Sequence, residues 1–180
     1  MTLEDRPDLK AMLETHPCYN ECAHRKFARM HLPIAPKCNI QCNFCNRKYD
    51  CTNESRPGVT SEVLTPEEAV EKIRFVKTKV PYLSVIGIAG PGDPLANEET
   101  FRALELVGKE FPELTLCLST NGLNLPKSVD RLRDLGVRFL TVTVNAIEPE
   151  VGAKVYDFVH YEGKSYHGKE AAEILLRNQQ

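Results

Sequence analysis

The stretch Cys38-Asn39-Ile40-Gln41-Cys42-Asn43-Phe44-Cys45 decides how the rest of this sequence is interpreted. Its three cysteines have the spacing CxxxCxxC and follow a short apolar run at residues 31–36. Thiolates so close in sequence can converge on one metal centre. A closed zinc site needs four ligands, and a ferredoxin cluster is normally held by four cysteines. Three cysteines on a four-iron cluster therefore leave one iron open to a group that is not protein.

The same spacing also fits a zinc knuckle in which Cys51 or a histidine is the fourth ligand. The aromatic Phe44 completes the pattern CxxxCxΦC, where Φ is aromatic, and this pattern resembles the signature of the radical S-adenosylmethionine (SAM) superfamily. The resemblance implies that SAM chelates the open iron of a 4Fe-4S cluster through its amino and carboxylate groups. An electron from the cluster then cleaves a C–S bond of SAM to give a 5′-deoxyadenosyl radical, while the protein supplies ligation, orientation and exclusion of water.

Length and charge exclude several classes of protein. The 180 residues are enough for one domain with a hydrophobic core. A net charge of -2 gives no electrostatic reason to expect nucleic-acid binding. No apolar run approaches the roughly 20 residues of a membrane span, and the polar, acidic start of the chain does not resemble a signal peptide. We therefore expect a cytoplasmic protein that binds neither nucleic acid nor a membrane.

The cysteines point to metal ligation. Their number is odd, and six of the seven lie within residues 18–51. Without a secretion signal, this distribution favours metal binding in a reducing cytosol over a framework of disulfides. The seven are Cys18, Cys22, Cys38, Cys42, Cys45, Cys51 and Cys117.

Strand-like and helix-like segments alternate along the chain. Apolar, β-branched runs predict strands at 31–36, 82–89, 114–119 and 139–144. Helices are expected at 65–79, 97–109, 126–135 and about 168–178, the first with Thr65 as N-cap and an apolar face of Val70, Ile73, Phe75 and Val76. The alternation indicates an α/β fold with a parallel sheet and right-handed crossovers.

The expected architecture is a partial TIM-type (βα) barrel of the radical SAM kind at residues 31–180. Residues 1–30 would form an N-terminal cap segment that carries possible cluster ligands. Four βα units do not close a barrel, because eight units take about 250 residues. The barrel is therefore expected to be incomplete at its C-terminus, with the chain either naturally short or the front part of a longer protein.

Polar residues follow the predicted strands, and in parallel sheets ligands bind at the carboxyl ends of the strands. Gly90 and Gly92 allow close backbone approach, and Asp93 would accept a hydrogen bond from the SAM amino group. Short polar side chains would serve the ribose hydroxyls and the carboxylate of SAM, and those at the strand ends are Ser119, Asn121 and Asn145. Ordinary strand-exit turns are the alternative interpretation of both segments.

Longer segments narrow the resemblance to one family. The sequence resembles the NifB family of radical SAM enzymes, which act in nitrogenase cofactor assembly, in the segments HPCYNEC (16–22), FARMHLPIAPKCNIQCNFCNRKYDC (27–51), NESRPGV (53–59), AGPGDPL (89–95), STNGL (119–123) and TVTVNAIEPEVGAK (141–154). The resemblance implies an enzyme that fuses two 4Fe-4S clusters into an 8Fe core with a central carbide. One SAM would donate the methyl group that becomes the carbide, and a second would supply the radical that abstracts a hydrogen from it.

That activity implies additional ligands for a substrate 4Fe-4S cluster. The resemblance suggests that one substrate cluster is held by Cys18, Cys51 and Cys117. A nitrogen ligand could come from His16, His24 or His31, and His24 is ranked first. The alternative is that these thiols are incidental, with Cys117 a small buried apolar residue in its strand.

The resemblance also points to Glu54 and Arg56 as catalytic residues, in proton transfer or in positioning the substrate cluster; a solvated ion pair is the alternative. It implies three kinds of partner: an iron–sulfur cluster donor, assembly proteins that accept the cofactor, and an electron donor such as a ferredoxin or flavodoxin. Members of the family usually carry a further CxxC pair downstream, which this sequence lacks. Two other functions stay open, namely a different radical SAM enzyme and an iron–sulfur scaffold without SAM chemistry.

Overall fold

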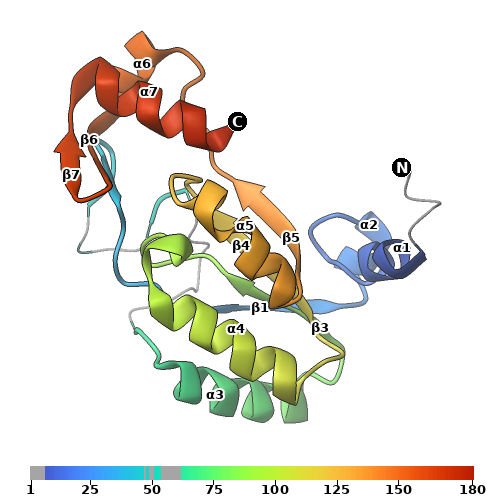
Figure 1. Cartoon of the computed structure of the whole chain (residues 1–180). Helices are drawn as coiled ribbons and strands as arrows, with labels where there is room; N and C mark the ends of the chain where they lie inside the picture. The colour runs from blue at the N-terminus through green and yellow to red at the C-terminus, as the bar shows by residue number, and fades with distance from the viewer. Residues whose placement is uncertain (1–6, 47, 49–50, 54–61) are drawn as a thin grey trace.

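The computed structural model describes residues 7–46, 48, 51–53 and 62–180. Its main body is a parallel sheet with the strand order β1-β3-β4-β5. The strands are β1 (Ala28–Leu32), β3 (Leu83–Ile88), β4 (Thr115–Thr120) and β5 (Val137–Val142). Within the described residues β1 and β5 are the two edges of this sheet, so the predicted α/β fold is confirmed as an open, partial barrel (Figure 1).

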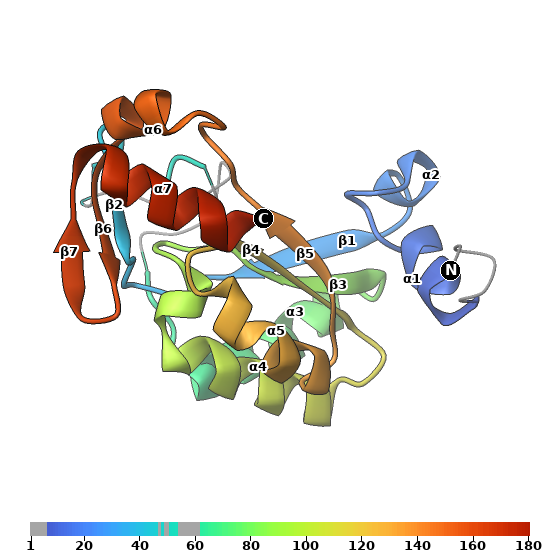
Figure 2. The same ribbon diagram turned by 45° about the horizontal axis from the view of Figure 1, so that its top comes forward.

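Helices connect the parallel strands and cover one face of the sheet (Figure 2). They are α3 (Pro66–Lys79), α4 (Glu98–Glu110) and α5 (Leu125–Asp134). The large hydrophobic core lies between these helices and the sheet, and strand residues such as Ile86 and Leu118 pack in it against Ile73 and Leu104 of the helices. The predicted helices and three of the four predicted strands are therefore present, with boundaries shifted by a few residues.

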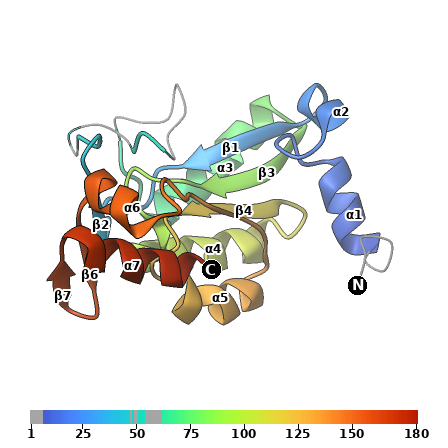
Figure 3. The ribbon, with the colours of Figure 1, turned by 90° about the horizontal axis from the view of Figure 1, so that it is seen from above.

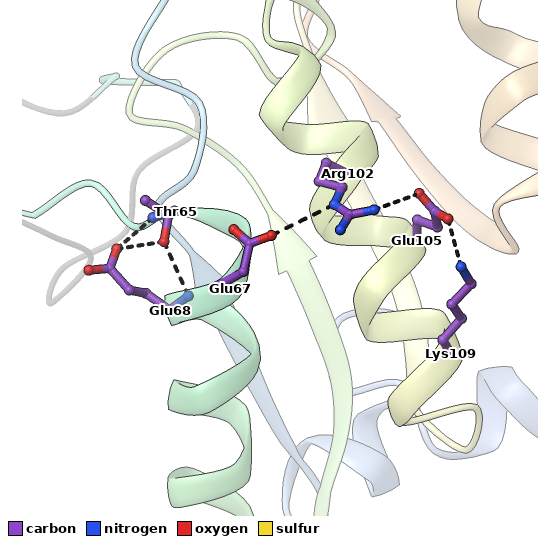
Figure 4. Close-up of polar contacts among 6 residues, drawn as sticks. All are labelled: Thr65, Glu67, Glu68, Arg102, Glu105 and Lys109. Carbon is purple, nitrogen blue, oxygen red and sulfur yellow. Dashed lines mark hydrogen bonds and ion pairs between the residues drawn. The ribbon is translucent and has the colours of Figure 1, made fainter.

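Helix α3 begins at a capping box. The Thr65 hydroxyl accepts a hydrogen bond from the Glu68 N–H at 3.2 Å, and the Glu68 carboxylate accepts from the Thr65 N–H at 2.8 Å (Figure 4). The carboxylate also accepts from the Thr65 hydroxyl at 2.9 Å, and the two bonds that it accepts from Thr65 lower the pKa of Glu68. On the same exposed side, Arg102 of α4 lies 3.7 Å from Glu67 and so joins the two helices.

Two details of the predicted elements are wrong. The first strand ends at Leu32 and begins at Ala28, whereas it was predicted at 31–36. Pro33 follows directly, and proline cannot donate a ladder hydrogen bond. Phe75 was placed on the apolar face of its helix but is 65% exposed. The buried residues of α3 include Ala69, Val70 and Ile73, and a residue two positions after Ile73 points to the opposite side of a helix.

A second, antiparallel sheet has the order β2-β6-β7. Its strands are β2 (Ile40–Cys42), β6 (Tyr156–Tyr161) and β7 (Lys164–Tyr166), and it is accompanied by α6 (Pro149–Val155) and α7 (Gly168–Gln179). A small core joins Ile40 and Cys42 to Tyr156, Val159 and Leu175. The sequence predicted α7 but neither β2 nor the β6–β7 hairpin. The three-residue β2 pairs with a distant strand and has little local signal, whereas the hairpin turns at Glu162 and Gly163, a local signal that the prediction did not use.

The N-terminal segment contains α1 (Pro7–Glu14) and α2 (Glu21–His24). These helices and the antiparallel sheet lie at opposite ends of the parallel sheet (Figure 3). The Ser84 hydroxyl of β3 donates to the carbonyl of Thr15 at 2.7 Å, which attaches the segment to the sheet. No helix in the described part of the chain has the length and apolar character needed to cross a membrane.

Candidate metal centre

The loop that leads to the cysteine triplet is held by the segment that follows β3. The N–H of Gly92 donates to the carbonyl of Ala35 at 2.5 Å, and the N–H of Asp93 donates to the carbonyl of Lys37 at 2.9 Å. A Cβ atom at Gly92 would lie 2.9 Å from the carbonyl oxygen of Ala35 and still closer to the carbonyl of Lys37. Only glycine fits this close approach between the two backbones, which gives Gly92 a role in positioning the residue before Cys38.

The buried side chain of Asn97 holds the same position from the other side. Its Oδ1 accepts from the N–H of Lys37 at 3.1 Å, and its Nδ2 donates to the carbonyl of Lys37 at 2.8 Å. Nδ2 also donates to the carbonyl of Asp93 at 2.8 Å. This role could not be predicted from the sequence, because an asparagine before a helix is usually an N-cap, whereas the Asn97 side chain makes no cap hydrogen bond.

Asp93 is only 2% exposed and faces the interior. Its carboxylate accepts hydrogen bonds from the Thr120 hydroxyl at 3.0 and 2.8 Å, and from the N–H groups of Asn121 at 2.6 Å and Leu95 at 3.0 Å. Asp93 thus joins the ends of β3 and β4. The geometry assigns it this structural role, while a contact between Asp93 and SAM stays a prediction.

The cysteine triplet lies where the parallel sheet meets the small core. Cys42 is buried on β2, and the half-buried Cys38 and Cys45 pack against the same core. The Gln41 side chain donates to the carbonyls of Cys42 and Cys45 at 2.9 Å each and so fixes the turn between them. None of the three thiols is in a disulfide. In the part of the chain that the structure describes, no three Cys, His, Asp or Glu side chains form a preformed metal-binding group.

A 4Fe-4S cluster fits the donors of this loop. Three thiols without disulfide partners are the ligands that such a cluster takes. Beside them, the Nδ2 of the buried Asn39 has no hydrogen-bond partner among the described residues. A buried donor without an acceptor costs free energy, and the sulfur atoms of a cluster would provide the acceptor.

A pocket of about 430 Å³ opens on the sheet face that α3, α4 and α5 leave uncovered. Its lining includes Cys18, Arg29, His31, Cys117, Ser119 and Thr141. His31 and Cys117 lie in one row of paired residues, because both pair with Gly87, which also lines the pocket. A Cβ atom at Gly87 would lie 2.8 Å from the His31 ring, so the glycine gives the imidazole its space over the sheet.

The segment before α2 brings Cys18 to this pocket. The Nη1 of Arg29 donates to the Cys18 sulfur. The N–H of Cys18 donates to the Nδ1 of His16 at 3.2 Å. The fully buried His16 ring packs against Tyr19 and Phe139 at centroid distances of 4.6 and 4.5 Å. Burial, with the nearby Arg29 charge, lowers the pKa of His16 to about 4. A neutral imidazole therefore orients the backbone of Cys18.

The structure separates the predicted ligands into two groups. Cys18 and Cys117 both line the pocket. The half-buried Cys51 is outside that lining, and its N–H donates to the carbonyl of Pro91 at 3.1 Å. His24 is exposed on α2 and does not line the pocket, whereas His31 does. A local pattern could have identified His31, because the polar Arg29 and His31 alternate with the apolar Met30 and Leu32 in β1. The prediction missed it because the first strand was placed at 31–36.

The remaining predicted residues have different surroundings. The carbonyl of Gly90 accepts from the N–H of Ala35 at 3.2 Å, which adds a third link to the loop before the triplet. Burial raises the pKa of Tyr156, and hydrogen bonds with Asn145 offset part of this rise. Ser119 lines the pocket. Glu54 and Arg56 lie outside the described residues.

Comparison with known proteins gives one family and a set of close relatives. The model of the radical SAM superfamily matches residues 32–178. The FeMo cofactor biosynthesis protein NifB of Klebsiella pneumoniae is 59% identical over 165 residues, which are 91% of this chain and 35% of that protein. The protein of the same name from Frankia alni is 56% identical over 174 residues, with 96% of this chain and 34% of that protein covered. The chain thus spans about a third of the length of these curated relatives.

Among solved structures, the crystal structure of BtrN in complex with AdoMet and 2-DOIA aligns with a TM-score of 0.48 and 18% identity. The alignment covers 67% of this chain and 47% of that chain.

Proposed function

We propose that this chain, which belongs to the radical SAM superfamily, fuses two 4Fe-4S clusters and inserts a SAM-derived carbide to form the 8Fe core of the nitrogenase cofactor. The similarity to proteins named for FeMo cofactor biosynthesis supports this pathway. The observation that carries the proposal is the second set of thiols. Cys18 and Cys117 lie in one pocket with His31 and Arg29, apart from the triplet, and SAM cleavage alone has no need of them.

The first set of residues would hold the resident cofactor. Cys38, Cys42 and Cys45 would ligate a 4Fe-4S cluster, which when bound supplies the electron that cleaves SAM. The chain's own contribution is the fixed approach to Cys38: the backbones after β1 and β3 are hydrogen-bonded to each other, and Asn97 holds Lys37 by both its N–H and its carbonyl. Such preorganisation keeps ligands in place without a cost at the moment of reaction.

The second set would hold a substrate cluster. Thiolates and imidazole are ligands for iron–sulfur clusters, and the pocket offers Cys18, Cys117 and His31, with Cys51 as a further proposed ligand. Arg29 adds a positive charge next to the Cys18 sulfur, and this charge would stabilise an anionic cluster. Of the three histidines that were open from the sequence, the pocket favours His31. Glu54 and Arg56 stay proposed as catalytic residues.

The partners follow from the proposed reaction. A cluster donor would load the chain, a ferredoxin or flavodoxin would reduce it, and an assembly protein would accept the product in the cytoplasm. These partners rest on the similarity to the FeMo cofactor biosynthesis proteins.

The proposal is tested by anaerobic reconstitution with iron and sulfide, followed by iron counting and electron paramagnetic resonance (EPR) with and without SAM. Four chains are compared: wild type, the Cys38/Cys42/Cys45→Ala triple variant, the Cys18/Cys117→Ala double variant, and Cys22→Ala as control. We expect wild type to hold more iron than one 4Fe-4S cluster contains. The triple variant should lose the EPR signal that responds to SAM, and the double variant should lose the other iron.

Cys22 is exposed on α2 and lies outside the pocket lining, so its replacement should change neither signal. If wild type holds the iron of a single cluster and the triple variant holds none, the chain is a different kind of radical SAM enzyme. An EPR signal that is indifferent to SAM would instead identify an iron–sulfur carrier.

A further inference from the structure

Two buried asparagines lie beside the first cysteine of the triplet. Asn121 follows β4 and is 7% exposed, and Asn39, directly after Cys38, is 9% exposed. The Oδ1 of Asn121 accepts from the N–H of Leu123 at 2.9 Å. Because a backbone N–H can only donate, this bond fixes which end of the Asn121 amide is oxygen. The Nδ2 end must therefore face Cys38 and Asn39.

The Nδ2 of Asn121 has two acceptors. It lies 3.7 Å from the Cys38 sulfur and 2.7 Å from the Oδ1 of Asn39. The second bond in turn fixes the orientation of the Asn39 amide and leaves its Nδ2 buried without a hydrogen-bond partner in the described part of the chain. One oriented N–H donor thus bonds the Cys38 sulfur, and a second donor, on the residue directly after Cys38, is buried and unsatisfied.

Both backbone polar groups of Asn121, its N–H and its carbonyl, are held by hydrogen bonds. Its N–H donates to the buried Asp93 carboxylate at 2.6 Å, and its carbonyl accepts from the Gln179 side chain at 2.7 Å. The β3 exit and the end of α7 therefore both locate this residue. A donor held in this way needs no reorganisation to bond a sulfur atom.

We propose that Asn121 and Asn39 are positioning residues that donate N–H···S hydrogen bonds to the sulfurs of the cluster bound at Cys38 and raise its reduction potential. The inference rests on the proposed function, in which Cys38, Cys42 and Cys45 hold the cluster. Hydrogen bonds to the sulfurs are one of the means by which a protein sets the potential of a cluster. They stabilise the reduced form more strongly, because the reduced cluster carries the larger negative charge and charge-assisted bonds are stronger. From the sequence, Asn121 was expected to bind SAM instead.

The test is a redox titration of the reconstituted chain without SAM, followed by EPR, for wild type and two variants. In Asn121→Ser the hydroxyl can still accept from the N–H of Leu123, but it lacks the donor that reaches Cys38. Asn39→Leu keeps the shape of the side chain and removes the unsatisfied donor, together with the Oδ1 that accepts from Asn121. Each variant should shift the reduction equilibrium roughly tenfold toward the oxidised cluster, which is about 59 mV to lower potential for a one-electron couple.

Asn124→Ser is the matched control, because the Asn124 amide donates to the carbonyl of Leu95 at 2.8 Å instead of to a cysteine. It should leave the potential unchanged. Iron content and circular dichroism show whether each variant is folded and loaded, and SAM affinity is measured on the same samples. If Asn121→Ser does not hold a cluster, the shift in Asn39→Leu decides the matter.

The outcomes separate this inference from the function on which it rests. An unchanged potential in a loaded variant would overturn the inference and leave the proposed function standing, and so would a variant that loses SAM affinity at unchanged potential. A wild-type chain that assembles no cluster would contradict both.

Discussion

The two faces of the parallel sheet are built from the same strands but carry different chemistry. One row of paired residues faces the helices and consists of Leu32, Ile88, Leu118 and Leu140. The adjacent row, shifted by one residue, consists of His31, Gly87, Cys117 and Phe139. The first row belongs to the large hydrophobic core, and the second borders the pocket and the ring of His16.

The difference follows from the pleat of the strands. Successive side chains of a strand point to opposite faces, so a displacement by one residue exchanges the faces. Helices α3, α4 and α5 remove water from the first row (Figure 2). These helices do not cover the second row. The N-terminal segment packs on Phe139 through His16 and Tyr19, and the rest of the row combines a thiol, an imidazole and the space above a glycine. Alternate residues of a strand thus serve stability and chemistry. A substitution in the first row should lower the free energy of unfolding, and one in the second row should lower the iron content.

The largest expected effect comes from comparing Leu118→Ala with Cys117→Ala. Leu118 is 0% exposed in the large core, and a Leu→Ala change in such a core costs about 3 kcal/mol of unfolding free energy. Cys117→Ala, on the half-buried face, should cost less than about 1 kcal/mol but remove a proposed ligand of the substrate cluster. Urea unfolding of the metal-free chain measures the first effect, and iron content after reconstitution measures the second.

The comparison would fail if Cys117→Ala destabilised the chain as much as Leu118→Ala. In that case Cys117 would be a core residue and the two faces would not divide stability from chemistry. Retention of all iron by Cys117→Ala would remove this residue from the proposed ligands.

The next effect concerns His16, which is buried against the uncovered face. Its pKa is lowered from 6.5 to about 4 in the folded chain. Because the unfolded chain then binds the proton more readily, stability is fully present above pH 6.5 and is lost as the pH falls through this interval toward 4. The loss should reach about 3 kcal/mol, at 1.36 kcal/mol for each pH unit of the shift.

Urea unfolding of the metal-free chain between pH 7 and pH 4 measures this loss. The matched variant is His16→Asn, in which an amide oxygen can accept from the N–H of Cys18 and nothing titrates. The variant should lack the loss of unfolding free energy that comes from protonation of His16. The losses that come from carboxylates are the same in both chains and cancel when the two curves are subtracted. Parallel curves for the two chains would show that His16 is not buried in its neutral form.

The smallest effect is expected at the exposed start of α3, far from both rows. Thr65→Ala removes the capping box with Glu68 (Figure 4) and should cost about 1 kcal/mol of unfolding free energy. Arg102→Ala is a matched surface control. The Arg102 side chain is 53% exposed where it pairs with Glu67 and Glu105, and such surface pairs contribute about 0.5 kcal/mol. Thermal or urea unfolding measures the free energy of unfolding of both variants. A larger loss for Arg102→Ala than for Thr65→Ala would contradict the expectation.

The missed strand β2 and the missed position of His31 have a common origin. Periodicity and capping predicted α3, α4, α5 and α7 and three of the parallel strands, because those signals are local. The strand β2 lies within the cysteine loop and pairs with β6, more than a hundred residues later, and no local pattern encodes such a pairing. The place of His31 in the pocket was missed for a related reason, since a first strand shifted along the chain hides which residues alternate on its faces.

The sequence by itself determined the class of the fold and the cysteine triplet, and it proposed a set of residues that carry chemistry. Spacing and residue type suffice for these, because ligands close in sequence are close in space and amphipathic segments reveal their period. Only the tertiary structure decided which residues meet: it buries Asp93 against Thr120 and Asn121, places Asn97 on Lys37, and joins Cys18 to Cys117 in one pocket. Such contacts depend on the register and packing of distant strands, where a displacement of a single residue exchanges one face for the other.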